Sequence, residues 1–124
     1  MTPQASIIDG AVALSYGAQS DWTGLAAIVR FAPSGRIDVR NGAYYNYQAN
    51  IWYKSGVTYD IRMVVDVPAK KYSVYVTPQG GSEILLANQY GFRGQQTWVP
   101  ALDHWTVNQV GSSGSLTACE FTVQ

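Results

Sequence analysis

Apolar and polar residues alternate along several short runs of this chain with the two-residue period of a β-strand. The longest run is 57–67, which is apolar at odd positions and mostly polar at even ones. In the run 70–77 the even positions Tyr72, Val74 and Val76 are expected to face a core, and the odd positions to face solvent. These two runs predict two amphipathic strands.

Turn-forming residues separate these runs from several others. Asn41-Gly42 is a strong hairpin signal after the run 36–40, and the clusters 32–35 and 78–81 hold Pro and Gly. Further strands are expected at 11–15, 25–31, 83–86, 102–110 and 116–123, while 88–100 shows no clean period and is interpreted as a long loop. No segment sustains a capped helical period. The 124 residues therefore predict one all-β domain, an antiparallel β-sandwich over residues 1–124.

The segment Ala43–Tyr53 is the part of the chain richest in aromatic and amide side chains. If it is one strand, its odd positions pack on the core: Ala43, Tyr45, Tyr47, Ala49, Ile51 and Tyr53. Its even positions then form one exposed face: Tyr44, Asn46, Gln48, Asn50 and Trp52. A flat ring offers a surface for the C–H face of a sugar, and amides both donate to and accept from hydroxyls.

This even-numbered face is our candidate ligand-binding site, with glycan as the expected ligand. Amides are less usual on a solvated strand than Lys and Glu, which favours binding over an ordinary exposed face. The plainer interpretations are an edge strand with scattered surface residues, or a contact between two copies of the chain. A bulge near Asn46 or Gln48 would exchange the two sets of side chains beyond it.

Four further residues are candidates for the same ligand. Trp22 and Trp98 sit in polar loops, where they either bind a ligand or fold back over the end of the sandwich. Arg40 and Arg62 are expected to adjoin the face and to select charged or hydroxyl-rich ligands. The simpler role of such charges is mutual ion pairing. Asp38 is expected to lie opposite Asp60 or Arg62 on a neighbouring strand, where a cross-strand ion pair is the ordinary interpretation.

Charge and cysteine content narrow the classes of partner. Eight Lys and Arg balance eight Asp and Glu without any block of like charge, so we expect neither nucleic acid nor a membrane as a partner. Few charges with much Tyr, Trp and Gly are typical of a secreted β-protein. Cys119 is the single cysteine, which excludes an intrachain disulfide, and we expect its thiol to be buried and inert. The first residues hold no signal peptide and suggest a piece of a longer secreted protein.

Catalytic chemistry finds little support in the residue pattern. Glycoside hydrolysis needs two carboxyl groups on either side of a sugar. Asp60 and Asp66 share a strand face but lie roughly 20 Å apart at about 3.3 Å per residue. A polysaccharide lyase site could draw on His104, Arg93 and Tyr90. We expect no enzymatic activity.

Several segments carry a resemblance to a known type of module. Residues 56–76, with 35–42, 78–83 and 119–123, resemble the jelly-roll, laminin-G/concanavalin-like modules attached to secreted bacterial polysaccharide-degrading enzymes. The resemblance covers roughly residues 24–123. It implies a jelly-roll sandwich that binds a polysaccharide and holds a larger multidomain enzyme on its substrate, with no catalysis and no required cofactor. Many such modules carry a structural calcium, but no calcium motif maps onto this chain, so its metal ligands stay unassigned.

The expected function is therefore a carbohydrate-binding module. Trp52 replaces the small residue or Pro usual in such modules, which adds an aromatic ring to the amide-rich face. Three alternatives stay open: a small polysaccharide lyase or glycoside hydrolase domain, a structural adhesion domain of an appendage or phage fibre, and a module whose charged faces bind an anionic polymer.

Overall fold

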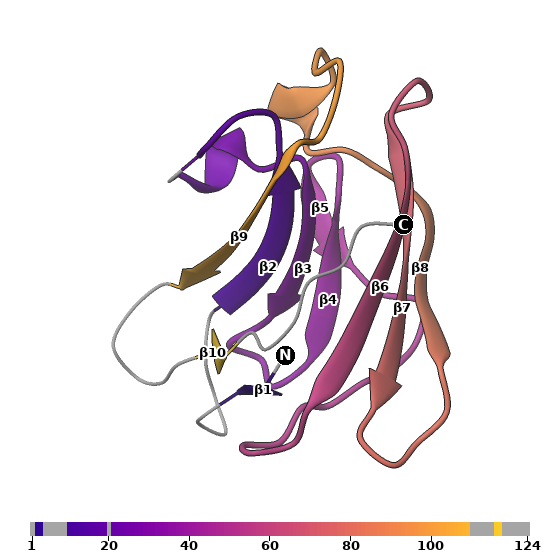
Figure 1. Ribbon diagram of the computed structural model, residues 1–124. Helices are drawn as coiled ribbons and strands as arrows, with labels where there is room; N and C mark the ends of the chain where they lie inside the picture. The colour runs from indigo at the N-terminus through magenta and orange to yellow at the C-terminus, as the bar shows by residue number, and fades with distance from the viewer. Residues whose placement is uncertain (1, 4–9, 20, 110–115, 118–124) are drawn as a thin grey trace.

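A computed structural model describes residues 2–3, 10–19, 21–109 and 116–117 of the chain (Figure 1). Within these ranges the secondary structure consists of short strands and two single turns of 3-10 helix. The strands are β1 (Thr2–Pro3), β2 (Gly10–Ser15), β3 (Ala27–Phe31), β4 (Ile37–Asn41), β5 (Tyr44–Asn46), β6 (Tyr59–Asp66), β7 (Lys71–Pro78), β8 (Ile84–Gly91), β9 (His104–Gln109) and β10 (Leu116–Thr117). The 3-10 turns are η1 (Trp22–Gly24) and η2 (Gly94–Gln96).

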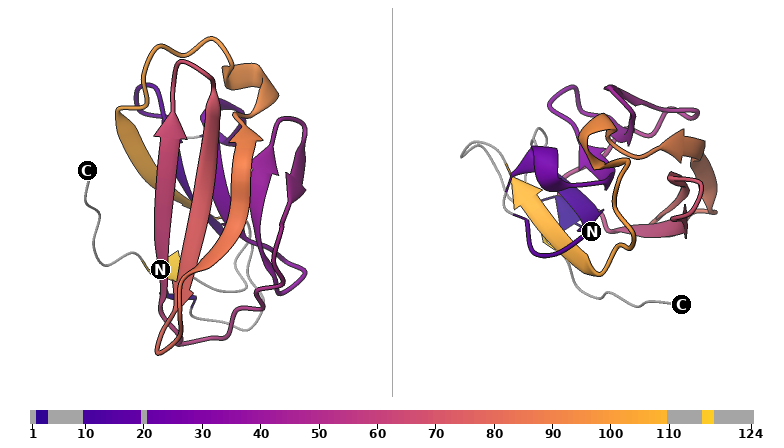
Figure 2. Two further views of the ribbon diagram at one scale, coloured as in Figure 1. Left: turned by 90° about the vertical axis from the view of Figure 1, so that its right-hand side faces the viewer. Right: turned by 90° about the horizontal axis from the view of Figure 1, so that it is seen from above.

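Two antiparallel sheets form the two layers of the fold. The first has the strand order β5-β4-β3-β2-β9 and the second the order β6-β7-β8, while β1 pairs separately with β10. Figure 2 (left) looks onto the three-stranded sheet with the five-stranded sheet behind it. The all-β, sandwich-like class predicted from the sequence is confirmed.

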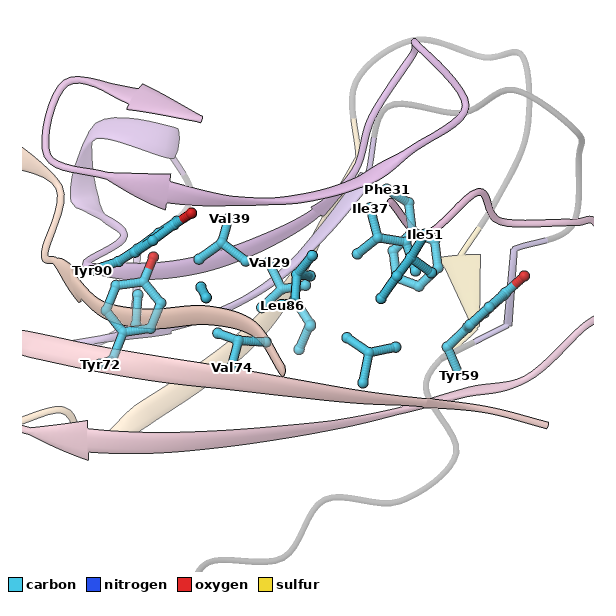
Figure 3. Close-up of a cluster of buried hydrophobic side chains, with 14 of the residues drawn as sticks. Val29, Phe31, Ile37, Val39, Ile51, Tyr59, Tyr72, Val74, Leu86 and Tyr90 are labelled. Carbon is cyan, nitrogen blue, oxygen red and sulfur yellow. The ribbon is translucent and has the colours of Figure 1, made fainter. Parts of the chain in front are cut away.

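The core lies between the two sheets and takes one side chain in two from each strand. Figure 3 shows side chains from both layers meeting there, among them Val29, Val39, Val74 and Leu86. In β7 the even positions Tyr72, Val74 and Val76 are buried as predicted, and in β6 the odd positions are the less exposed ones. The two-residue period therefore identified the core faces of these strands correctly.

The tyrosine hydroxyl of Tyr72 joins the two layers by hydrogen bonds. It accepts from the Ile28 amide at 3.2 Å and donates to the Arg40 carbonyl. In the β3–β4 ladder, Val29 pairs with Val39, so Ile28 and Arg40 would form the next pair. The hydroxyl takes the place of a backbone hydrogen bond at the end of this ladder, which satisfies two buried polar groups.

Strand β8 is longer than predicted. The pattern placed a strand at 83–86 and a loop from residue 88, but β8 continues to Gly91. The pairing with β7 shifts register between Tyr72 and Tyr75, and Gln89 has a left-handed φ of 57°. A bulge of this kind breaks the alternation of side chains, so the period disappears although the strand does not.

The prediction of one strand over Ala43–Tyr53 is wrong. Strand β5 ends at Asn46, and the chain pairs with its neighbour again at the isolated bridge between Arg36 and Trp52. Val39 pairs with Asn46 in β4–β5, and the same register continued along the chain would pair Arg36 with Ala49. Arg36 pairs with Trp52 instead, so three extra residues lie between the two pairings. An odd insertion reverses which side chains face the core beyond it.

Two further expectations concern the ends and the helices. The strand predicted at 116–123 is described only as β10, and Cys119 lies outside the described residues. In the described part of the chain no helix is long and apolar enough to span a membrane.

Candidate functional site

Charged side chains occupy the outer face of the five-stranded sheet, away from the core. Arg36, Asp38 and Arg40 alternate with the buried Ile37 and Val39 along β4 and its approach, so the three charged residues point to the outer side. Arg30 of β3 pairs with Asp38 in the ladder and therefore shares this face.

Arg30 donates two hydrogen bonds to the Asp38 carboxylate, one to each oxygen. Its Nε lies 2.9 Å from Oδ1 and its Nη2 lies 2.7 Å from Oδ2. Asp38 is buried, and the Arg30 side chain is about three-quarters covered. This bidentate geometry is the strong form of an arginine–carboxylate interaction.

Trp52 reaches the same outer face because its two neighbours are buried. Ile51 and Tyr53 lie in the core, and the Tyr53 hydroxyl donates to the Ala32 carbonyl at 2.6 Å. The Ile37 amide donates to the Ile51 carbonyl at 2.8 Å, which fixes the backbone beside β4. Successive side chains of an extended segment point to opposite sides, so the Trp52 ring is held outward and is 55% exposed.

Arg36 lies over two aromatic rings on this face. Its guanidinium carbon is 4.4 Å from the centre of the Trp52 ring and 4.1 Å from that of Tyr47. The buried Arg36 Nε has no hydrogen-bond acceptor among the described residues. Cation–π contacts therefore hold this arginine in place and no carboxylate neutralises it in the described part of the chain.

A second arginine–aromatic group surrounds Tyr45, the ladder partner of Arg40. The guanidinium carbons of Arg30 and Arg40 lie 3.8 Å and 5.2 Å from the Tyr45 ring centre. Burial raises the pKa of Tyr45, and burial followed by the nearby charge of Arg93 lowers the pKa of Arg40. We call the two groups together the arginine face, which comprises Arg30, Arg36, Arg40, Tyr45, Tyr47 and Trp52.

The amide-rich residues do not share one face with Trp52. Tyr44 and Asn46 are opposite Asn41 and Val39, on the side of the sheet that faces the other layer, although both are exposed at its edge. Tyr44 is 74% exposed, and the Asn46 side chain accepts from the Tyr47 amide. The five even-numbered residues are all exposed as predicted, but the structure separates Tyr44 and Asn46 from Trp52.

Gln48 and Asn50 belong to the insertion between the two pairings. Both side chains are exposed, and the Gln48 amide donates to the Leu86 carbonyl of β8 at 2.8 Å. This bond fastens the insertion to the edge of the second sheet. Tyr45 and Tyr47, which were expected in the core, belong to the outer face instead.

The two loop tryptophans have different environments. Trp22 of η1 is half-buried and packs, together with Tyr45, against a small apolar cluster of Ala11, Ala13, Leu25 and Ile28. Trp98 is 65% exposed, meets Tyr16 edge-on with ring centres 5.8 Å apart and donates from Nε1 to the Gln95 carbonyl. Its neighbour η2 is bonded near Gly42, at the end of β4 opposite to Arg36. Trp98 and Trp52 therefore lie toward different ends of the sandwich.

Arg62 lies on the other sheet and does not adjoin the arginine face. It faces outward from β6, forms a bidentate pair with Glu83 at 2.8 and 3.1 Å, and lies over the Tyr75 ring. The expected position of Asp38 opposite Asp60 or Arg62 is wrong because Asp38 and β6 belong to different sheets, and Asp38 pairs with Arg30 instead. The hydrogen bond to Arg62 lowers the pKa of Glu83.

The residues considered for catalysis occupy separate environments. Tyr90 is buried in the core, and Arg93 Nε donates to Gln95. His104 Nδ1 lies 2.8 Å from Asp103 Oδ1, and Asp103 also accepts from the Gly17 amide, so these two bonds lower its pKa. Among the described residues no three His, Cys, Asp or Glu side chains gather in a way that could hold a metal ion.

Sequence reasoning named Arg40 and Trp52 of the arginine face but missed Arg30, Arg36, Tyr45 and Tyr47. A signal for the arginines was present, since Arg36-Ile-Asp-Val-Arg40 places three charges on one side of a strand. The tyrosines could not be assigned because the break after Asn46 has no mark in the two-residue period.

Comparisons with known proteins found no match for this chain. No protein family matches it, and neither a curated protein nor a solved structure does.

Proposed function

We propose that this chain is a non-catalytic carbohydrate-binding module that binds a polysaccharide through exposed, fixed aromatic side chains. The single observation that carries the proposal is Trp52, whose ring is more than half exposed while its backbone and both neighbours are fixed. An exposed indole that is already immobilised loses little conformational entropy when a ligand stacks on it.

The surroundings of Trp52 support sugar binding over a chance exposure. Tyr47 adds a second exposed ring, which contacts Arg36 as Trp52 does. The exposed amides of Gln48 and Asn50 lie in the chain between Tyr47 and Trp52. Rings provide stacking surface, while amides and guanidinium groups provide hydrogen bonds to hydroxyls. Rigid aromatic residues with a few polar groups beside them are a common composition of ligand sites.

The proposal includes the finer architecture and the setting of the module. We infer a jelly-roll sandwich that is secreted as part of a larger polysaccharide-degrading enzyme and keeps that enzyme on its substrate. The resemblance of residues 56–76 to such modules supports this part of the proposal, and a structural calcium belongs to the same expectation.

Affinity electrophoresis against a panel of plant, algal and microbial polysaccharides tests the proposal. We expect at least one soluble polysaccharide in the gel to retard the protein, and the retardation to weaken when the free polysaccharide is added as a competitor. Migration unchanged by every polysaccharide of the panel would contradict the proposal.

A further inference from the structure

Positive charge is concentrated on one side of a chain that has no net charge. Arg30, Arg36 and Arg40 lie on the arginine face, and Arg93 is close enough to influence Arg40 and Tyr45. Arg62 is the arginine that lies elsewhere, paired with Glu83 on the other sheet. Among β3, β4 and β5, which the structure describes in full, Asp38 is the only carboxylate. The face therefore carries more positive than negative charge.

Asp38, the one carboxylate of β3, β4 and β5, shows how the arginines of this face bind an anion. Arg30 binds Asp38 through both Nε and Nη2, so that each carboxylate oxygen accepts one hydrogen bond from the guanidinium group. Arg36 and Arg40 have no such partner among the described residues, although both are fixed beside aromatic rings. The Arg40 Nε donates to the Gly42 carbonyl at 3.0 Å, which further fixes that side chain. Arginines that are already oriented lose less freedom when they bind a planar anion.

We propose that the arginine face binds carboxylate groups of an acidic polysaccharide, with Arg36 and Arg40 as the carboxylate ligands and Trp52 and Tyr47 stacking on the sugar rings. The inference rests on the proposed function and specifies its ligand class. Arg36 and Arg40 are four residues apart on one side of an extended segment, a separation of about 13 Å. A polymer with regularly repeated carboxylates can contact both arginines at once, whereas a single small acid cannot.

Burial of the arginines agrees with an anionic ligand. Arg40 is half-buried, and burial together with the charge of Arg93 makes its charged form less favourable than in water. An anion bound beside these groups would offset that cost. The aromatic rings also exclude water from one side of Arg36, where a bound carboxylate would interact more strongly than in bulk solvent.

The experiment compares each acidic polysaccharide with its own uncharged form. Binding is measured by isothermal titration calorimetry with alginate, hyaluronan and polygalacturonate, each beside its methyl ester, and with dextran sulfate beside dextran. We expect at least one carboxylate form to bind at least tenfold more tightly than its ester, with affinity falling as salt is raised. The Arg36→Gln and Arg40→Gln variants should each lose at least about fivefold of that affinity, an estimate for one charged hydrogen-bonded contact.

The control variant is Lys71→Gln, which removes one positive charge from the outer face of the other sheet. Lys71 is exposed and lies opposite Asp66 in the ladder between β6 and β7. The Lys71→Gln variant should bind the acidic polysaccharide as tightly as the unaltered protein does, because specific contacts and not overall charge carry the binding. Arg36→Lys keeps the charge without the fork and should also bind more weakly, which covers the case in which Arg36→Gln fails to fold.

Five results would overturn the inference. Equal binding of esters and acids, or binding of neutral polysaccharides alone, would refute it and leave the carbohydrate-binding function standing. Preference for dextran sulfate over every carboxylate, or an equal loss in Lys71→Gln, would also refute it. Absence of binding to all of these and to the neutral panel would refute the proposed function as well.

Discussion

The guanidinium carbon of Arg36 lies 4.4 Å from the centre of the Trp52 ring, and a β-bridge joins the backbones of the same two residues. The bridge fixes both side chains on the outer face of the sheet, so the contact does not depend on two flexible side chains meeting by chance. The arginine covers part of the ring and leaves more than half of Trp52 exposed.

Replacing Trp52 with Ala should separate binding from folding. Because the ring lies outside the core but contacts Arg36, we expect the free energy of unfolding to fall by no more than about 1 kcal/mol. Binding to the polysaccharide that the panel identifies should weaken at least about tenfold, the scale of one lost stacking contact. Calorimetric titration and urea denaturation measure the two effects.

Trp98→Ala is the matched control for this variant. Trp98 is at least as exposed as Trp52 but lies toward the other end of β4 and makes its ring contact with Tyr16, so its removal should weaken binding less than removal of Trp52. If Trp98→Ala weakens binding and Trp52→Ala does not, the site lies at the loop end. If Trp52→Ala unfolds the domain, Trp52 is a structural residue.

The hydroxyl of Tyr72 should contribute measurably to stability. Tyr72→Phe keeps the packed ring but leaves the Ile28 amide and the Arg40 carbonyl without their bridging partner. The cost of such unsatisfied buried groups is about 1–3 kcal/mol. Urea denaturation should show a lower midpoint for Tyr72→Phe and an unchanged one for Tyr44→Phe, whose ring is exposed. Equal midpoints for both variants would contradict the bridging role.

Stability should fall at alkaline pH because of the buried tyrosines. Burial raises the pKa of Tyr72, and it also raises those of Tyr45 and Tyr90. Above about pH 10 the unfolded chain releases tyrosine protons that the folded chain retains, so the unfolded state gains stability relative to the folded state. The stabilisation of the folded state by its buried, protonated tyrosines is fully present below about pH 10 and is lost as the pH rises further. Denaturation midpoints at pH 8 and at about pH 10.5 should differ less for Tyr72→Phe than for the unaltered protein, and an identical difference would exclude Tyr72 as a source.

The two bidentate ion pairs should differ in their importance for stability. Arg30–Asp38 lies largely covered on the five-stranded sheet, whereas Arg62–Glu83 is exposed on the other. Asp38→Asn should destabilise the fold by about 1–3 kcal/mol, since it leaves a covered guanidinium without its counter-charge. Glu83→Gln should leave the denaturation midpoint almost unchanged, because water and salt screen an exposed pair. A larger effect of Glu83→Gln than of Asp38→Asn would show that burial does not govern these pairs.

The sequence by itself determined the features that depend on neighbouring residues. The period over 57–67 and 70–77 correctly identified β6, β7 and their core faces, and Asn41-Gly42 correctly marked the turn between β4 and β5. These features are local, since side chains alternate along an extended chain and glycine accepts the left-handed φ of 61° at Gly42. The exposure of Trp52 was likewise predicted correctly.

Tertiary structure decided the register of the segment after Asn46 and with it the composition of the site. Burial of Ile51 and Tyr53 and the bridge between Arg36 and Trp52 absorb three extra residues, which moves Tyr45 and Tyr47 to the outer face beside the arginines. A pattern with a period of two cannot reveal such an insertion, because the local preferences of residues 47–50 are the same in either register. Long-range packing against β3 and β4 selects between the registers, and that is why the arginine face emerges only from the folded chain.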